Sequence, residues 1–162
     1  MFDQERKLYE FMHGYGRRLL SSIPDEDYAK QPQPGVNHPT WILGHLTQVA
    51  QFGVTICGGD PWLNSDWGQK FGVGSQPTSD PAAYPTAEEM RVAYDDGHQR
   101  LSRAMAEDLS VDLSQPNPVA QLASVLPTQR DLLSHILTTH EATHLGQLSA
   151  WRRSMGMDLA AF

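Results

Sequence analysis

The sequence predicts an all-α protein, a four-helix bundle with long crossover loops. Four segments of the 162-residue chain repeat their apolar residues with the 3.6-residue period of a helix. The stretches between these segments are rich in Gly, Pro, Asn and Ser, which is typical of connections in a bundle. No segment of useful length alternates apolar and polar residues as a strand does. The chain length fits one domain, over residues 1–162.

The first two helices are predicted from their apolar stripes and from the residues at their ends. The first helix covers about residues 2–22 and stops before Pro24. The second opens at Asn37, which suits a helix cap, and Pro39 follows at an early helical position. It runs to Cys57, after which a Gly-Gly-Asp-Pro stretch ends it.

The third and fourth helices are predicted from capping residues. Thr86 and Glu89 have the spacing of a capping box, and the helix they begin is expected to run to about Leu109. The last helix begins after Pro127, with Thr128 as its cap, and ends at Met155 before a glycine.

The crossover between the second and third helices, residues 58–85, is long for a compact domain. Loops of this length are usually functional or partly structured. Two interpretations stay open for its aromatic residues, which either cover the end of the bundle or face a substrate. The candidate contacts are Trp62, Trp67 and Lys70.

Composition excludes several classes of function. The formal charge of −7 argues against a protein that binds nucleic acid or an anionic membrane, since both need clustered Lys and Arg. The most apolar stretch, residues 41–57, is interrupted by polar residues and is therefore no membrane span. A single cysteine, Cys57, and a charged N-terminus predict a cytoplasmic protein without an intrachain disulfide. A core of this size needs no structural metal, so any metal is expected to be functional.

Three of the seven histidines are predicted to face the core. On a helical wheel, His140 and His144 lie in the middle of the apolar stripe of the last helix, and His45 lies in that of the second. Burying three imidazoles is costly unless each finds a partner, and one shared divalent cation would satisfy all three. The i, i+4 pair lets two imidazoles of one helix reach the same ion, while a third ligand from a facing helix leaves a coordination position open.

The other four histidines are assigned elsewhere. His135 falls about 140° from His140 on the wheel and is predicted to be at the surface. His98 lies at the edge of its stripe and is predicted to be a core residue or to support a ligand. His13 and His38 are expected at the surface.

Two polar residues of the last helix are candidate catalytic residues. Glu141 lies about 80° from the mean direction of the histidine pair, so it is either a base at the edge of the site or, as we favour, a residue of the solvated flank. Gln147 is predicted to point inward and to orient a ligand histidine or a bound water.

Residues 140–144 also satisfy the H-E-x-x-H pattern of zinc proteases. Such enzymes take a third ligand downstream, yet the residues after His144 contain no His or Glu and only one acid, Asp158. The sequence also shows no β-rich half that would present an extended peptide. The protease interpretation is therefore the least favoured.

Together these residues resemble the DinB-like superfamily, which includes the YfiT-type and mycothiol-dependent isomerase bundles. The resemblance rests on Asn-His-Pro-Thr-Trp-Ile-Leu-Gly-His-Leu at 37–46 and on His-Glu-Ala-Thr-His-Leu-Gly-Gln-Leu at 140–148. Residues 61–72 and 84–89 add weaker support. The resemblance implies a four-helix bundle, often homodimeric, in which a histidine triad holds a divalent metal. Residue by residue, that triad is His45, His140 and His144.

The resemblance also implies a class of activity. Relatives include metal-dependent transferases or isomerases that use low-molecular-weight thiols, so a thiol-dependent S-transferase acting on a small molecule is the leading expectation. A small-molecule hydrolase comes second. The non-enzymatic alternative is a metal-binding, stress-associated dimeric module. Imidazole ligands suit Zn²⁺, Ni²⁺ or Fe²⁺, and the sequence does not choose among these ions.

Overall fold

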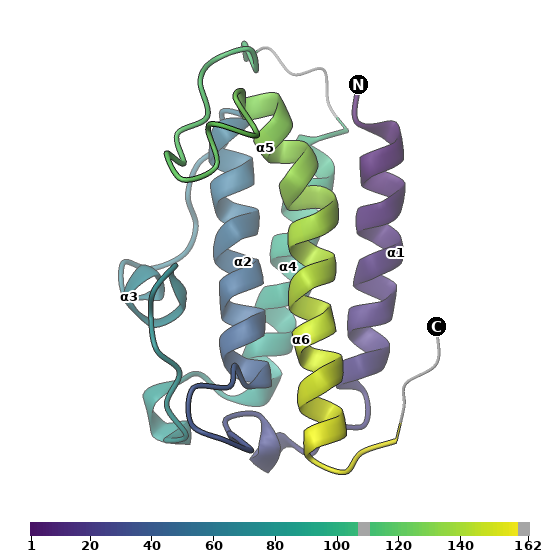
Figure 1. Cartoon of the computed structure of the whole chain (residues 1–162), viewed down its shortest axis with the longest axis vertical. Helices are drawn as coiled ribbons and strands as arrows, with labels where there is room; N and C mark the ends of the chain where they lie inside the picture. The colour runs from purple at the N-terminus through teal and green to yellow at the C-terminus, as the bar shows by residue number, and fades with distance from the viewer. Residues whose placement is uncertain (107–110, 159–162) are drawn as a thin grey trace.

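The computed structural model describes residues 1–106 and 111–158, and it is helical as predicted. Four long segments run side by side in Figure 1. They are α1 (Asp3–Leu20), α2 (Pro39–Ile56), α4 (Ala87–Ala104) and a continuous segment made of α5 (Gln129–His135), the π-helical turn η3 (Ile136–His140) and α6 (Glu141–Ser154). The short elements are η1 (Asp25–Asp27), α3 (Trp67–Phe71) and η2 (Pro81–Ala83). The described residues contain no strand, only an isolated bridge between Pro116 and Thr128.

The helices are arranged so that two pairs form opposite faces of the bundle. α4 packs against both α2 and α1, and α6 packs against both α1 and α2. In Figure 1, α2 and α6 therefore lie at the front, while α4 lies behind them with α1 at its side. Within the described ranges, no helix has the length and apolar character needed to cross a membrane.

The helix starts follow the sequence except at α2. Thr86 forms the predicted capping box, and Thr128, which was predicted as a cap, forms a full capping box with Asp131. The cap of α2, however, is His38 rather than Asn37, because the Nδ1 atom of His38 accepts from the backbone N–H of Trp41 at 3.2 Å. The predicted end of the third helix, Leu109, lies outside the described residues.

His38 is fully buried, so its predicted surface position is wrong. Its Nε2–H donates to the carbonyl oxygen of Thr78 at 3.0 Å, so this part of the crossover covers the ring. Burial lowers its pKa to about 4, so the ring is neutral at pH 7 and can act as a capping acceptor.

The crossover packs along the side of α2 rather than over the end of the bundle. The ring of Phe71 is fully buried against Gly44, where a Cβ atom would lie only 2.2 Å from it. The indole N–H of Trp67 donates to the carbonyl oxygen of Gly44 at 2.8 Å. Farther along, the side chain of Gln51 accepts from the backbone N–H groups of Trp62 and Leu63 at 2.8 and 2.6 Å. The missing side chain of Gly44 thus allows the crossover to approach α2 one residue before His45.

Candidate metal centre

The three predicted histidines meet between α2 and the last helical segment. One ring nitrogen from each of His45, His140 and His144 lies within 4.8 Å of the other two. The Nε2 atoms of His45 and His140 are 3.2 Å apart. Two nitrogens bound tetrahedrally to one zinc ion at 2.0–2.1 Å would be about 3.4 Å apart. The residues present therefore fit one shared divalent ion.

His45 is held by the crossover. Its Nδ1 atom lies 2.8 Å from the carbonyl oxygen of Phe71, which can only accept, so Nδ1 carries the proton. The lone pair is then on Nε2, the atom that faces His140. The indole of Trp41 stacks on the imidazole with ring centres 4.9 Å apart and planes inclined by 7°. These two contacts fix both the tautomer and the orientation that a ligand requires.

His144 is held by a pair of amides. Its Nδ1–H donates to the Oε1 atom of Gln147 at 3.2 Å, and the same oxygen accepts from Nδ2 of Asn37 at 3.1 Å. This leaves Nε2 of His144 with its lone pair. Gln147 therefore contacts a ligand histidine as predicted, although the residue is exposed and not inward-facing. The role of Asn37 was missed because its position before Pro39 suggested only a helix cap.

The electrostatics of the centre keep the three imidazoles neutral, as metal ligands must be. Burial, reinforced by the neighbouring histidines, lowers the pKa of His140 to about 3. Burial and the proximity of His45 lower that of His144 to about 4. Burial also lowers the pKa of His45, which is the most enclosed of the three. Since His140 and His144 are only half-buried, solvent reaches the centre from their side.

The π-helical turn brings a fourth histidine close to the centre. Between Ile136 and His140 the backbone forms the wider i to i+5 turn, which adds a residue to one turn of the helix. A wheel drawn at 100° per residue fails across such a turn. His135, predicted to point away, is half-buried with its ring 5.7 Å from that of His140. Its Nδ1 atom is bonded to the hydroxyl of Thr139 at 2.6 Å, and it is outside the group of three that could hold the ion.

Glu141 is buried in the core, so the favoured position on the solvated flank is wrong. Only 2% of the residue is exposed, and its Oε1 atom accepts from the hydroxyl of Tyr94 at 2.6 Å. Burial raises the pKa of Glu141 to about 7, against the opposing effect of the Tyr94 bond. The carboxyl group is thus held toward α4 directly after a ligand residue. Its role as a base stays a prediction.

The remaining histidines form a stacked cluster between α1 and α4. The rings of Tyr9 and His98 are 3.7 Å apart, and those of His98 and His13 are 3.9 Å apart. His98 is buried and its Nε2–H donates to the carbonyl oxygen of Tyr9 at 3.0 Å, so it belongs to the core as predicted. His13 is not at the open surface, since its Nε2 atom is 2.6 Å from the carboxylate of Asp95 and its side chain is only 15% exposed.

A first prediction concerns the amide that supports His144. Gln147→Leu removes the acceptor of the Nδ1–H and leaves the ring free to rotate, so we expect metal affinity to fall by about 10- to 100-fold. Competition with a chelator measures this affinity. Gln147→Glu is the matched control, because its carboxylate still accepts and should preserve or raise the affinity. Equal affinities of the leucine and glutamate variants would contradict the prediction.

A second prediction concerns His98 and pH. Burial, followed by the nearby His13, lowers its pKa to about 3, whereas in the unfolded chain it titrates near its ordinary 6.5. Only the unfolded state gains a proton as the pH falls below 6.5, so His98 should reduce the free energy of unfolding by about 1.4 kcal/mol per pH unit between pH 6 and 4.

Urea titrations in EDTA, with wild type and His98→Phe compared at each pH, isolate this contribution. The slope of wild type should be steeper than that of the variant by about 1.4 kcal/mol per pH unit. The comparison is needed because Glu141, whose pKa is raised, acts in the opposite sense as the pH falls from 7. Parallel slopes would show that His98 protonates equally in both states.

Comparison with known proteins agrees with this geometry. A family model described as the DinB superfamily matches residues 9–148, a span that contains all three histidines. A search of curated proteins found no match.

Proposed function

The chain belongs to the DinB superfamily, and from this membership we propose that it binds one divalent metal ion through His45, His140 and His144 and uses it in a thiol-dependent transfer to a small molecule. The observation that carries the metal site is the 4.8 Å grouping of three imidazole nitrogens. Phe71 holds His45, and Gln147 holds His144, in the tautomer that a metal ligand needs. Zn²⁺, Ni²⁺ and Fe²⁺ are the candidate ions, since imidazole suits each of them.

The reaction class follows from the kind of site. A divalent ion held by these three histidines would lower the pKa of a coordinated thiol or water and so make it a nucleophile near neutral pH. The chain contributes the neutral ligands and, through buried Trp41, an apolar wall against His45. Substrate would enter on the half-buried side, beside His140 and His144. Support for a thiol substrate comes from the resemblance to relatives that use low-molecular-weight thiols.

A screen of low-molecular-weight thiols against electrophilic acceptors tests the activity. The metal-loaded chain should consume thiol and acceptor together, and removal of the metal or the change His140→Ala should abolish turnover. Turnover that survives both treatments would reject the mechanism. A chain that holds its metal but transfers no thiol would instead fit the non-catalytic, metal-binding module. Casein cleavage that depends on His140 and Glu141 would favour the protease interpretation.

We also propose that the protein is a homodimer in which α1 contributes to the interface. Leu8 and Phe11, one turn apart on this helix, are 52% and 53% exposed although both are large and apolar. Apolar side chains that cluster at a surface favour contact with a partner. Light scattering at micromolar concentration tests this, and the change Leu8→Glu should shift the mass toward that of one chain. A wild-type mass of 18.0 kDa would refute the dimer.

A further inference from the structure

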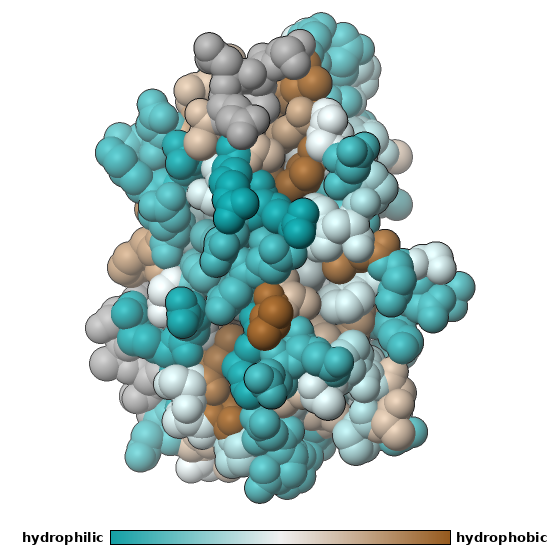
Figure 2. Space-filling view, turned by 180° about the vertical axis from the view of Figure 1, so that it is seen from behind, coloured by the Kyte–Doolittle hydropathy of each residue, from teal (hydrophilic) through white to brown (hydrophobic). Residues whose placement is uncertain are grey.

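A groove runs between α1 and α4, on the opposite face of the bundle from the histidine triad. Its volume is about 430 Å³, and its walls include Arg6, Glu10 and Arg17 of α1 and Ser102 and Arg103 of α4. The floor is made by the stacked rings of the cluster between these helices. Figure 2 shows this rear face, where strongly hydrophilic side chains gather in a band down the middle, over α4. The metal ligands come from α2 and the last segment, so the groove is a separate place on the molecule.

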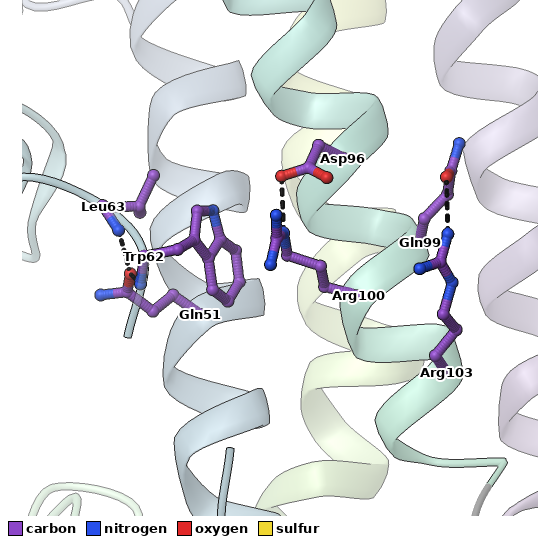
Figure 3. A network of polar contacts seen from close by, with 7 residues as sticks. All are labelled: Gln51, Trp62, Leu63, Asp96, Gln99, Arg100 and Arg103. Carbon is purple, nitrogen blue, oxygen red and sulfur yellow. Dashed lines mark hydrogen bonds and ion pairs between the residues drawn. The ribbon is translucent and has the colours of Figure 1, made fainter. Parts of the chain in front are cut away.

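The groove concentrates positive charge on a chain whose net charge is −7. Three guanidinium groups line it, and among the described residues of its wall only Glu10 carries a carboxylate. On α1, Arg6, Glu10 and Arg17 recur with the spacing of one helix face. From α4, Arg103 reaches into the space on the side toward α1, as Figure 3 shows, while Arg100 and Asp96 pair on the side toward α2.

These guanidinium groups have little of their bonding capacity satisfied. Arg6 approaches Glu10 only at 4.0 Å, and its Nε atom is buried with no hydrogen-bond partner among the described residues. Arg103 bonds to the neutral amide of Gln99 at 3.4 Å. Within the described ranges, no carboxylate lies within ion-pair distance of Arg17. A guanidinium presents five donors that match the oxygens of phosphate and carboxylate, so three open ones around a hollow form a receptor for such groups.

The neighbouring hollow does not share this excess of positive charge. The next hollow along the same two helices shares Arg17 but is also lined by Glu88 and Asp95. Its other arginine, Arg91, is already paired with Asp25 at 2.7 Å. Arg6 and Arg17 are eleven residues apart, which places their Cα atoms about 16 Å apart along α1. The groove therefore offers cationic groups at both ends of an extended space.

We propose that the groove between α1 and α4 binds an elongated anionic small molecule, whose phosphate or carboxylate groups pair with Arg6 and Arg103 at one end and with Arg17 at the other. The ligand lies across the bundle from the metal. Its binding is therefore independent of the metal ligands.

Calorimetric titration with tripolyphosphate, and in parallel with the dicarboxylate suberate, tests the proposal. The experiment uses the full chain with His140→Ala as host, because tripolyphosphate chelates metals, and NaCl keeps the ionic strength equal. We expect saturable binding, weakened at least tenfold by the double change Arg17→Gln and Arg103→Gln. Glu10→Gln removes the carboxylate found among the described residues of the wall and should tighten binding severalfold. The stronger of the two titrants identifies whether phosphate or carboxylate is the preferred group.

Arg18→Gln is the matched control, because it removes the same charge from the neighbouring position of α1 outside the groove wall. It should leave the affinity within about twofold. Absence of saturable binding by both titrants would overturn the proposal, as would equal weakening by Arg18→Gln and Arg17→Gln. A change in oligomeric mass on loss of Arg17 and Arg103, with anion binding unaltered, would also overturn it by assigning the groove to contact between chains.

Discussion

His140→Ala is expected to reduce affinity for divalent metal on the order of 100-fold or more, because it deletes one of three protein ligands and no other imidazole takes its place. The centre sits on rigid helices, and the nearest further histidine, His135, has its Nδ1 atom bonded to Thr139. Elemental analysis of the purified chain and competition with a chelator measure the loss. The triple change of His45, His140 and His144 to alanine should leave no bound metal.

His135→Ala is the control for this experiment. It removes an imidazole from the same helical segment, 5.7 Å from the ring of His140, but not one of the three grouped nitrogens. We expect its metal content to equal that of the wild type. Circular dichroism of each variant establishes that the helices remain. If wild type purified above pH 7 carries no stoichiometric metal, or if His135→Ala loses as much metal as His140→Ala, the assignment of the centre is wrong.

Gly44→Ala is expected to be the most disruptive small substitution in the bundle. Its methyl group would lie 2.2 Å from the Phe71 ring, which is fully buried and cannot turn aside without moving α3. Overpacking of this kind costs typically 1–3 kcal/mol, more than the roughly 1 kcal/mol that alanine gains over glycine within a helix. Displacement of Phe71 would also remove the carbonyl that orients His45, so metal affinity should fall together with stability.

Gly14→Ala provides the opposite result at a comparable helical position. Nothing lies within 4 Å of a Cβ built on Gly14, so no steric clash opposes the higher helix propensity of alanine. The substitution should therefore stabilise α1 by about 0.5–1 kcal/mol. Urea unfolding of both variants, without metal and with saturating Zn²⁺, separates the packing cost from the metal effect. A stable Gly44→Ala chain with unchanged metal affinity would show that the crossover does not support the centre.

Much of this molecule could be predicted from local patterns. The capping box at Thr86 and the cap at Thr128 depend on contacts within four residues, and both were predicted correctly. The inward orientation of His45 follows from the regular period of α2. The same reasoning predicted the shared orientation of His140 and His144, because the π-helical turn ends at His140 and regular helix follows it.

Other features could not be predicted because they arise from contacts between distant segments. His38 was expected at the surface, yet it is buried when the crossover returns over it at Thr78. Glu141 was placed on a solvated flank, but it is buried in the core, where the hydroxyl of Tyr94 on α4 donates a hydrogen bond to it. The wheel misplaced His135 because the π-helical turn changes the helical period, and that turn carries no proline or glycine to announce it.

The sequence by itself determined the helical class, the starts of α4 and of the last segment, and the three histidines that converge, because each depends on periodicity and short-range capping. Only the tertiary structure decided which distant atoms complete the site: the Phe71 carbonyl on His45, the Asn37 amide that bonds to Gln147 and the buried acid beside His140. The same holds for the arginine groove, whose walls come from two helices with residues 21–86 between them. Hydrogen bonds and charge clusters of this kind depend on packing across tens of residues, and no local pattern encodes them.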